Sequence, residues 1–394
     1  MALTLVFNVG SSSLTAKAFR DGTAVARVKA NRVGVTGTEP PCIEATIGGT
    51  AMTVSTPVLT HAEAAERIVR LLRDNAMEVT RVGHRFVHGG HRITRAAEIT
   101  PEVLETLRAC LPLAPIHNPA AFAVIEAARR LLPATQQYVV ADTAFHATIP
   151  PAVRAYALPQ PYRDRFLKVG FHGLSYENVT ARLRGFLGAD VPRVVACHLG
   201  TGGSSCCAIR NGASLDTSMG ASPLAGLVMS TRCGDIDPTV PIELATELGA
   251  DETVRLLNTR SGLLGVSGLS SDIRDILREV AEDGPHRAEC QLAFDVYVRQ
   301  LVKTVGGLIA ELGGIDALVF TDQVGLEVWQ VRDALCRQLA FLGVHLDAAR
   351  NAAATGAVLE RISAETSAVA VYLVPNDEEL VIYEKGCELF AHAK

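Results

Sequence analysis

Residues 3–13 read LTLVFNVGSSS and residues 194–205 read VVACHLGTGGSS, so two stretches far apart in the chain follow one plan. In each stretch, an apolar, strand-like run ends in a tip of small residues. A second strand-like run follows each tip and ends in a tight-turn pair, Asp21-Gly22 or Asn211-Gly212, at the same distance from the tip. This repetition predicts a duplicated α/β unit.

A further apolar run in each half ends in an acidic residue. Residues 138–142 read YVVAD, and residues 317–322 read ALVFTD. Helical stretches are expected between the strand-like runs. The chain has 394 residues, which is beyond the size at which one hydrophobic core keeps growing, so two domains are expected.

The composition excludes several classes of protein. The formal net charge is -5, and no cluster of five or more basic residues could follow a nucleic-acid backbone. The chain has no charge-free run of eighteen apolar residues and no basic signal-peptide region at its start. The nine cysteines form no CxxC pair, which argues against a disulfide framework or a zinc site. We therefore expect a soluble cytoplasmic protein with no nucleic-acid or membrane partner.

The two tips predict an anion site. Glycine and serine leave backbone N–H groups uncovered, so two facing tips would form a concave site lined with hydrogen-bond donors. One tip alone could equally be an ordinary hairpin turn, but two at matching places favour phosphate binding. The candidate phosphate-binding residues are Ser11, Ser12, Ser13, His198, Gly200, Thr201, Gly202 and Gly203.

Three arginines lie where a cation needs a partner. Arg85 lies in an apolar run that ends in a double glycine, Arg232 lies in a loop punctuated by Gly and Pro, and Arg274 follows Asp272 closely. A guanidinium in such a place can hold a carboxylate or phosphoryl group by charge-assisted hydrogen bonds of about 1.5–3 kcal/mol each. A structural ion pair with an Asp or Glu is the alternative for Arg85.

Histidines in turn-rich segments and one aspartate complete the candidates. His117, His172 and His198 can each donate to a phosphoryl oxygen, although a lone histidine is more often a satisfied structural donor. Asp142 stands at the carboxyl end of a strand-like run, where open α/β sheets bind ligands. Its carboxylate could bind an arginine, act on a substrate proton, or only cap a helix.

Together these segments resemble the acetate kinase family, which belongs to the superfamily of acetate and sugar kinases, Hsp70 and actin, over essentially the whole chain. The resemblance is specific because many motifs occur in the family's order. They are residues 8–13 (NVGSSS), 84–85 (HR), 114–119 (APIHNP), 142–146 (DTAFH), 170–175 (GFHGLS), 198–200 (HLG), 231–238 (TRCGDIDP), 262–269 (GLLGVSGL) and 376–380 (NDEEL).

The resemblance implies a duplicated α/β fold of the actin-like, ribonuclease H-like kind, with the active site in a cleft between two domains. The first domain would span residues 1–142 and be joined by a C-terminal helix, residues 376–394, and the second would span residues 143–375. Family members pair through the second domain, so a homodimer is expected.

The resemblance also implies direct in-line transfer of a phosphoryl group between acetyl phosphate and a phosphate acceptor. Asn8 and Glu378 would hold Mg²⁺ or Mn²⁺, and Asp142 would be the catalytic carboxylate. Two arginines would bind the acetate carboxylate and the passing phosphoryl group, and three histidines would assist. These are Arg85 and Arg232, with His172 on the transferring group and His117 and His198 on the substrate and donor phosphates.

An apolar wall is implied around the acetate methyl group. Val87, Ile116, Phe171 and Pro223 match the residues that form it in the family, so propionate should fit less well. One methylene is worth only about 1–3 kcal/mol in such a pocket, and selectivity should be modest.

The chain departs from the ATP-using members in three places. Thr15 stands where those members have lysine, with the nearest lysine at Lys17, and the second tip is longer than the family's HLGNG. The loop at residues 321–327 reads TDQVGLE instead of the glycine-rich GIGEN pattern. A glycine that lets the backbone approach a nucleotide cannot become glutamine without filling that space. We therefore predict an occluded nucleotide pocket, formed by Asp272, Arg274, Gln323 and Val324.

These departures resemble the pyrophosphate-linked acetate kinase of amoebic parasites more than the ATP-linked enzymes. The resulting hypothesis is that acetyl phosphate and phosphate react to give acetate and pyrophosphate. Three alternatives stay open: an ATP/ADP-dependent acetate kinase, a propionate or butyrate kinase, and a non-catalytic ligand-binding protein of the actin or Hsp70 kind.

Overall fold

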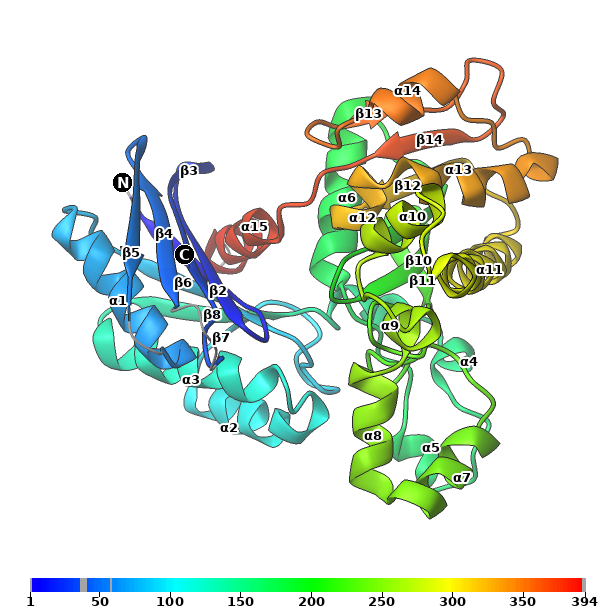
Figure 1. Cartoon of the computed structure of the whole chain (residues 1–394). Coiled ribbons are helices and arrows are strands. Elements are labelled where there is room, and N and C mark those ends of the chain that lie inside the picture. Colours follow the sequence, from blue (N-terminus) through cyan, green and yellow to red (C-terminus); the bar gives the residue numbers. More distant parts are fainter. Residues whose placement is uncertain (1, 36–40, 57–58, 392–394) are drawn as a thin grey trace. The chain divides into compact units, whose positions relative to one another are not determined.

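The computed structural model describes residues 2–35, 41–56 and 59–391 (Figure 1). The chain divides into two compact units. Unit 1 consists of Met1–Phe145 and Asp377–Lys394, and unit 2 of His146–Asn376. The limits predicted from the sequence, after residue 142 and before residue 376, lie close to these. Each unit is built on one β-sheet.

The sheet of unit 1 has the order β5-β4-β3-β2-β1-β6-β8-β7 among the described residues. The strands from β1 to β5 are antiparallel in succession, whereas β6 and β8 run parallel to β1. The bounds are β1 Thr4–Val9, β2 Ser13–Arg20, β3 Thr23–Asn31, β4 Cys42–Ile47, β5 Thr50–Ser55, β6 Arg81–Phe86, β7 Ala97–Glu98 and β8 Gln136–Ala141.

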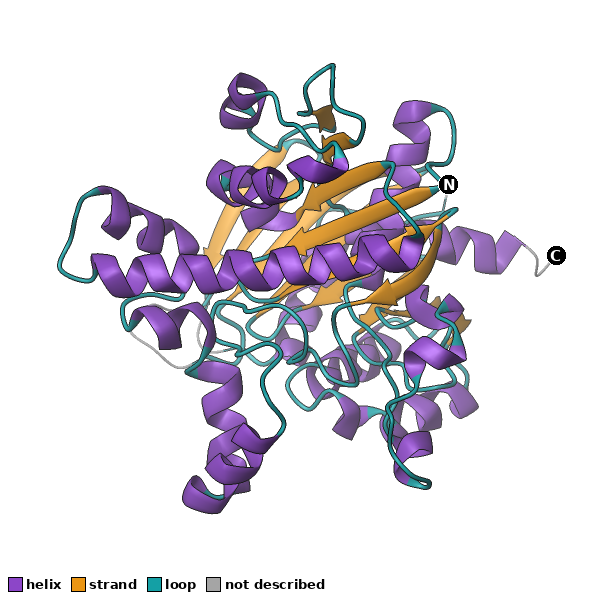
Figure 2. Cartoon of the chain, turned by 90° about the vertical axis from the view of Figure 1, so that its right-hand side faces the viewer, coloured by secondary structure: helices purple, strands orange, loops and turns teal. Residues whose placement is uncertain are grey.

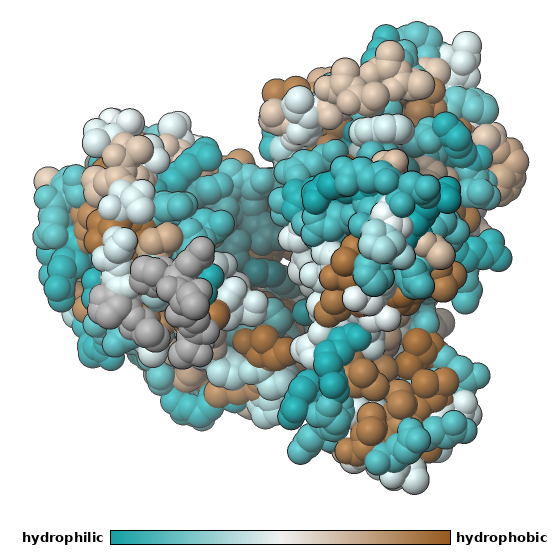
Figure 3. Space-filling model, in the orientation of Figure 1, coloured by the Kyte–Doolittle hydropathy of each residue, from teal (hydrophilic) through white to brown (hydrophobic). Residues whose placement is uncertain are grey.

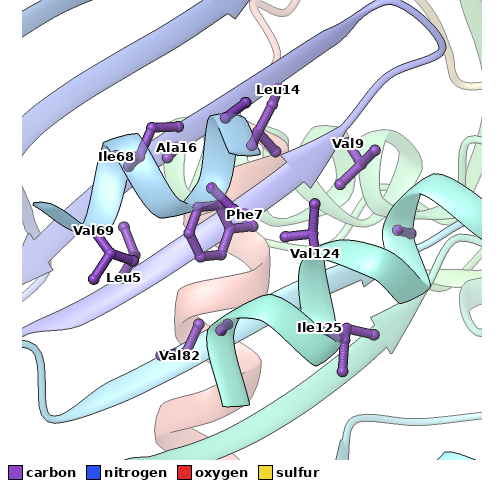
Figure 4. Packing of buried hydrophobic residues seen from close by; sticks show 14 of the residues in the cluster. Leu5, Phe7, Val9, Leu14, Ala16, Ile68, Val69, Val82, Val124 and Ile125 are labelled. Atoms are coloured by element: carbon purple, nitrogen blue, oxygen red, sulfur yellow. The ribbon is translucent and has the colours of Figure 1, made fainter. Parts of the chain in front are cut away.

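Helices cover both faces of this sheet. The helices α1 (His61–Asp74) and α3 (Asn118–Leu131) pack on one face, where Phe7 lies between Ile68 and Val124 (Figure 4). The helix α15 (Glu378–Ala391) packs against β1 and β6 on the other face. The remaining helices of this unit are α2 (Pro101–Ala109) and the short η1 (Leu111–Leu113).

Tyr138 fixes α15 to the sheet. Its hydroxyl donates a hydrogen bond to the carbonyl of Ile382 at 2.8 Å. A Cβ atom at Gly83 or Gly386 would collide with the Tyr138 ring, so both glycines are needed for this close approach. A helix that lies far along the chain therefore belongs to the first unit.

The sheet of unit 2 has the order β11-β10-β9-β12-β14-β13. Its strands are β9 (Arg193–Leu199), β10 (Ser204–Arg210), β11 (Ala213–Thr217), β12 (Ala317–Thr321), β13 (Glu360–Arg361) and β14 (Ala370–Leu373). The long helix α11 (Arg287–Leu312) lies in front of these strands in Figure 2 and packs against β9 and β10.

Shorter helices complete unit 2. They are α4 (Pro151–Arg154), α5 (Tyr162–Arg165), α6 (Gly173–Leu187), α7 (Thr239–Leu248), α8 (Ala250–Thr259), α9 (Gly262–Ser267), α10 (Ile273–Ala281), α12 (Asp322–Glu327), α13 (Trp329–Gln338), η3 (Ala340–Leu342) and α14 (Ala348–Ala353), while η2 (Phe145–Thr148) crosses the boundary between the units.

The two sheets share one plan, as the repeated sequence predicts. In each sheet, three antiparallel strands are followed by two parallel ones, β1 to β3 with β6 and β8, or β9 to β11 with β12 and β14. Both tips close with the same backbone hydrogen bond, 2.9 Å from Gly10 N to Ser13 O and 3.1 Å from Gly200 N to Gly203 O. The predicted α/β fold with a duplicated unit is confirmed.

One detail of the predicted repeat is wrong. The two acidic-ended runs are not equivalent, because β12 pairs with β9 whereas β8 pairs with β6 and not with β1. The counterpart of β12 is β6, and the counterpart of β8 is β14. Asp142 and Asp322 therefore follow different strands of the repeat. An apolar run that ends in a carboxylate is a local pattern, and it does not reveal which strands are neighbours.

Other expectations concern the cysteines and membranes. The structure has all nine cysteines as free thiols, and six of them are buried, as expected for small hydrophobic residues. Among the described residues, no helix combines the length and apolarity needed to cross a membrane.

Acidification from pH 6.5 to pH 4 is expected to destabilise both units. His84 in unit 1 and His146 in unit 2 are buried, and burial lowers the pKa of each from 6.5 to about 4. The unfolded chain then binds protons that the folded chain does not, so stability is full above about pH 6.5 and falls as the pH drops towards 4. Each histidine should account for up to about 3 kcal/mol.

Urea unfolding at pH 7 and pH 4.5 measures this effect. A His84→Asn variant should show a smaller decrease in the free energy of unfolding of unit 1 than the unaltered chain. An equal decrease in both proteins would show that His84 does not cause it.

Candidate active site

Four residues predicted from the sequence meet at one end of the unit 1 sheet. Arg85 in β6 donates from Nε to Asp142 Oδ1 at 2.9 Å and from Nη2 to Asp142 Oδ2 at 2.6 Å. Its Nη1 donates to Asn8 Oδ1 at 3.0 Å, and Glu378 Oε2 lies 3.9 Å from Nε. The strands β1 and β8 lie on either side of β6 and run parallel to it. The carboxyl ends of the three strands therefore bring these side chains together.

Charge pairing dominates this cluster. Burial opposes the charge of Arg85, yet the carboxylates of Asp142 and Glu378 raise the pKa of its guanidinium above the ordinary value. The ion pair considered as the alternative role of Arg85 is therefore present, and its partner is the predicted catalytic carboxylate.

Three residues, Glu379, Lys17 and Asp377, extend the cluster beyond those predicted to act. Asn8 Nδ2 donates to Glu379 Oε1 at 2.8 Å and to Glu378 Oε2 at 3.1 Å. Lys17 Nζ lies 3.0 Å from Glu379 Oε2 and 2.7 Å from Asp377 Oδ1. Lys17 was marked in the sequence only as the lysine nearest to Thr15, and its link to Glu379 could not be predicted, because it joins the two ends of the chain.

The donor set of Asn8 and Glu378 fits a hard divalent cation. Both supply oxygen, which Mg²⁺ and Mn²⁺ prefer. The Asn8 amide would turn to present Oδ1, which at present accepts from Arg85. Among the described residues, no three His, Cys, Asp or Glu side chains lie close enough together to hold a metal ion by themselves. Magnesium usually takes only one or two protein carboxylates and completes its shell with water and phosphate oxygens, so this small set suits it.

Asn118 holds the nearby loop of unit 1. It accepts from the backbone N–H of His88 at 3.1 Å and donates to the carbonyl of Cys110 at 2.7 Å. These bonds tie the segment after β6, which contains buried Val87, to the segment that carries His117 and exposed Ile116. Val87, Ile116 and His117, three of the predicted substrate residues of unit 1, thus lie on two connected segments.

Two histidines are stacked in unit 2. The rings of His172 and His198 lie 4.1 Å apart at an interplanar angle of 24°. His172 Nδ1 bonds Ser205 Oγ at 2.8 Å, and His198 Nδ1 bonds Ser175 Oγ at 2.8 Å. His172 has the left-handed φ of 59° at the start of α6. The sequence placed both histidines at the site but gave no sign of their contact or of the serines that orient them.

Arg232 points to the second tip, and no carboxylate in the described part of the chain pairs with it. Among the described residues, its contacts are Pro223 O at 3.5 Å and Met229 Sδ at 3.8 Å from Nη1. A Cβ atom at Gly203 would lie 3.2 Å from Arg232 Nη1 and 3.4 Å from His172 Nε2. Burial lowers the pKa of Arg232 from its ordinary value. A desolvated cation beside exposed backbone donors is suited to hold a phosphoryl group.

The other predicted residues are distributed between the units. Ser11 and Ser12 are exposed at the first tip, with Ser13 partly buried, and Thr201 and Gly202 are exposed at the second tip. Phe171 is buried in unit 2, where Pro223 is partly buried. The residues predicted to form the apolar wall therefore belong to different units.

Two of the four residues predicted to form the nucleotide pocket, Asp272 and Val324, line a small cavity. This cavity of about 10 Å³ lies among residues of the second tip, α9, α10, α11 and α12. Arg274 Nη2 lies 2.7 Å from Asp272 Oδ2, and its Nη1 lies 3.1 Å from Glu327 Oε2, so it joins α10 to α12. Gln323 is exposed and accepts from Thr201 Oγ1 at 3.3 Å. Buried Val324, and not Gln323, narrows the cavity.

Comparisons with known proteins show the family of this chain. The model of the acetokinase family matches residues 3–384. Acetate kinase from Finegoldia magna is 39% identical over 98% of this chain and 99% of its own length. The crystal structure of acetate kinase from Entamoeba histolytica is 54% identical, with a TM-score of 0.93 and coverage of 99% of this chain and 100% of that one. A propionate kinase from Francisella tularensis is 30% identical, with a TM-score of 0.88 and coverage of 98% and 99%. The chain belongs to the acetokinase family.

Proposed function

We propose that the protein is an acetate kinase that transfers the phosphoryl group of acetyl phosphate to inorganic phosphate and so forms acetate and pyrophosphate. A phosphate oxygen attacks the phosphorus, a new P–O–P bond forms, and the bond to the acetyl oxygen breaks. Acetate leaves with the bonding electron pair as a carboxylate. The protein positions two anions and neutralises their charge, and it forms no covalent intermediate with the phosphoryl group.

The residues of unit 1 would hold the acetyl end. Both oxygens of Asp142 accept from Arg85, which fixes the plane of the guanidinium. Arg85 would then hold the leaving carboxylate, while Val87 limits the space for the methyl group. A bound divalent cation, held by Asn8 and Glu378, would supply neutralisation of charge on the phosphoryl oxygens.

The residues of unit 2 would hold the phosphoryl oxygens. Arg232 Nη1 and His172 Nε2 both approach the backbone of the tip at Gly203. In the transition state, negative charge spreads over the equatorial oxygens, and donors at these positions lower its energy. His198 and Ser205 keep the His172 ring in place.

The small cavity lined by Asp272 and Val324 is the observation that supports phosphate as the acceptor. A volume of about 10 Å³ holds at most about one water molecule, whereas ligand pockets occupy about 300–1,000 Å³. Pyrophosphate ends where a nucleoside would begin, so a filled pocket does not impede it. The resemblance to pyrophosphate-linked amoebic enzymes supports the same choice.

An assay of phosphoryl transfer tests the proposal. The protein is given acetyl phosphate and Mg²⁺, with either phosphate or ADP as the acceptor. Pyrophosphate formed with phosphate, and no ATP with ADP, is the expected result. ATP formation at a comparable rate would establish the alternative, an ATP-linked acetate kinase. No transfer to either acceptor would contradict the proposed function as a whole, since the acyl substrate is common to both.

Opening the cavity should admit ADP. A Val324→Ala/Arg274→Ala variant removes the side chain that narrows the cavity and the link between α10 and α12. We expect ADP-dependent ATP formation to rise roughly tenfold over the unaltered protein, consistent with about 1–3 kcal/mol for small steric changes in a pocket. Arg337→Ala, at an exposed arginine of α13, is the control and should leave the ADP reaction unchanged. If ADP use does not rise, these two side chains are not what excludes it.

We propose that the functional protein is a homodimer formed through unit 2. Exposed apolar side chains gather on the lobe that carries α5, α7 and α8 (Figure 3). Tyr162, Ile242 and Val254 are 54%, 67% and 61% exposed. A monomer seldom leaves such a group of side chains in water.

Ile242→Glu should convert the dimer into a monomer, because a carboxylate at a self-paired surface places two like charges in an apolar contact. Analytical ultracentrifugation measures the change. Phe341→Glu is the control, since Phe341 is 82% exposed in η3, away from this lobe. A monomer in the unaltered protein, or a dimer that survives Ile242→Glu, would contradict the assignment.

A further inference from the structure

Asp322 occupies an unusual place between two segments that the proposed function uses. Its φ is +62°, in the left-handed region that non-glycine residues seldom adopt and that Asp and Asn tolerate best. It is the first residue of α12, so Gln323 and Val324 follow it directly. Its carboxylate nevertheless turns back to the phosphate tip, where a Cβ atom at Gly200 would collide with it.

The carboxylate of Asp322 contacts the predicted phosphate-binding histidine. His198 Nε2 lies 3.1 Å from Asp322 Oδ2, and His198 Nδ1 bonds the buried Ser175 at 2.8 Å. A carboxylate only accepts, so Nε2 carries the hydrogen and donates it. The ring is then held from both sides, which fixes its plane and leaves it no freedom to rotate.

The fixed ring of His198 supports the ring of His172. The two rings are stacked with centroids 4.1 Å apart, and His172 Nε2 is directed towards Gly203. On its other side, His172 Nδ1 bonds Ser205 Oγ. The orientation of His172 at the tip therefore depends on where His198 lies, and the position of His198 depends on Asp322.

We propose that Asp322 is a positioning residue for phosphoryl transfer, acting through His198 on His172. The inference rests on the proposed function and adds to it. The α12 segment carries both Val324, which lines the small cavity, and Asp322, whose carboxylate contacts the histidine of the phosphate tip. Acceptor choice and phosphoryl transfer are thus coupled through one backbone segment.

A double-mutant cycle tests whether Asp322 acts through His198. Asp322→Asn keeps the size of the side chain and its tolerance of the left-handed conformation but removes the charge. It should lower kcat roughly tenfold, with KM for acetyl phosphate within about twofold, as for other residues that orient a functional side chain. His198→Gln should have a similar effect. The double variant should be no slower than His198→Gln alone, because both changes remove the same interaction.

Two further variants separate the effect of the Asp322 carboxylate from the effect of its left-handed backbone conformation. Asp322→Gly relieves the left-handed strain and also removes the carboxylate, so it should lose as much activity as Asp322→Asn. Asp283→Asn is the matched control: Asp283 also has a left-handed φ, +56°, and its ion pair with Arg287 is exposed. It should keep full activity. Additive losses in the cycle, or full activity of Asp322→Gly, would overturn the proposal.

The cycle is measured with phosphate and with ADP as acceptor. If the unaltered protein makes ATP, the choice of pyrophosphate fails, but the cycle with ADP still reports on Asp322. If the unaltered protein makes pyrophosphate and the losses are additive, the positioning role fails and the proposed function stands. Thermal unfolding of each variant verifies that it is folded.

Discussion

Replacing Arg232 by methionine is expected to lower kcat/KM for acetyl phosphate by a factor on the order of 10³ while leaving the fold intact. No carboxylate among the described residues pairs with this guanidinium, whose contacts are the Pro223 carbonyl and the Met229 sulfur. Burial already disfavours the cation in the protein without an anion. Removing it therefore relieves a partly buried charge, so the free energy of unfolding should be unchanged or slightly higher.

Steady-state kinetics and urea unfolding measure the two effects together. Arg337→Met is the control, because that arginine of α13 is exposed and pairs only with Asp333 among the described residues. A loss of stability equal to the loss of activity would mean that Arg232 is mainly structural.

Replacing Arg85 by alanine is expected to abolish activity and also to destabilise unit 1. Arg85 and Asp142 form a two-point ion pair with side chains 15% and 2% exposed. Removing one partner of a buried pair leaves the other charge uncompensated, which costs about 3–5 kcal/mol. The melting temperature should fall by roughly 10 °C. Arg85→Ala and Arg232→Met are thus expected to have similar effects on activity and different effects on stability.

An Arg85→Met/Asp142→Leu variant separates the two effects. Apolar residues in place of both charges should restore most of the stability, because neither member of the Arg85–Asp142 pair is left without its partner. Activity should stay absent. If the double variant is as unstable as Arg85→Ala, packing around the pair, and not its charge, stabilises this region. Differential scanning calorimetry gives the answer.

The sequence predicted those parts of the fold that local patterns determine. The tips at Gly10 and Gly200 are recognisable because small residues end an apolar run. The turns at Asp21 and Asn211 are recognisable because Asp-Gly and Asn-Gly favour the positive φ that both turns have, 49° and 50°. Their equal spacing revealed the repeat. Strand neighbours are not a local property, and for this reason β8 and β12 were matched wrongly.

The same contrast between local patterns and distant contacts holds for the candidate site. Residue type and surroundings selected Arg85, Asp142 and Arg232, since charged groups in apolar runs or loops need partners. The residues that orient them were missed, because their contacts join distant parts of the chain. Glu379 reaches Asn8 across nearly the full sequence, and Asp322 reaches His198 from the start of α12. Serine and glutamate are too common for their positions alone to mark them.

The return of α15 to unit 1 has a consequence for biosynthesis. On the ribosome, unit 2 emerges as one continuous segment and can complete its sheet while α15 is still to come. Unit 1 begins first but finishes later, because the groove around Tyr138 stays uncovered until Ile382 and Gly386 arrive. Glu378 and Glu379 arrive with the same helix. A nascent chain therefore acquires its full set of charges around Asn8 and Arg85 only when its first unit closes.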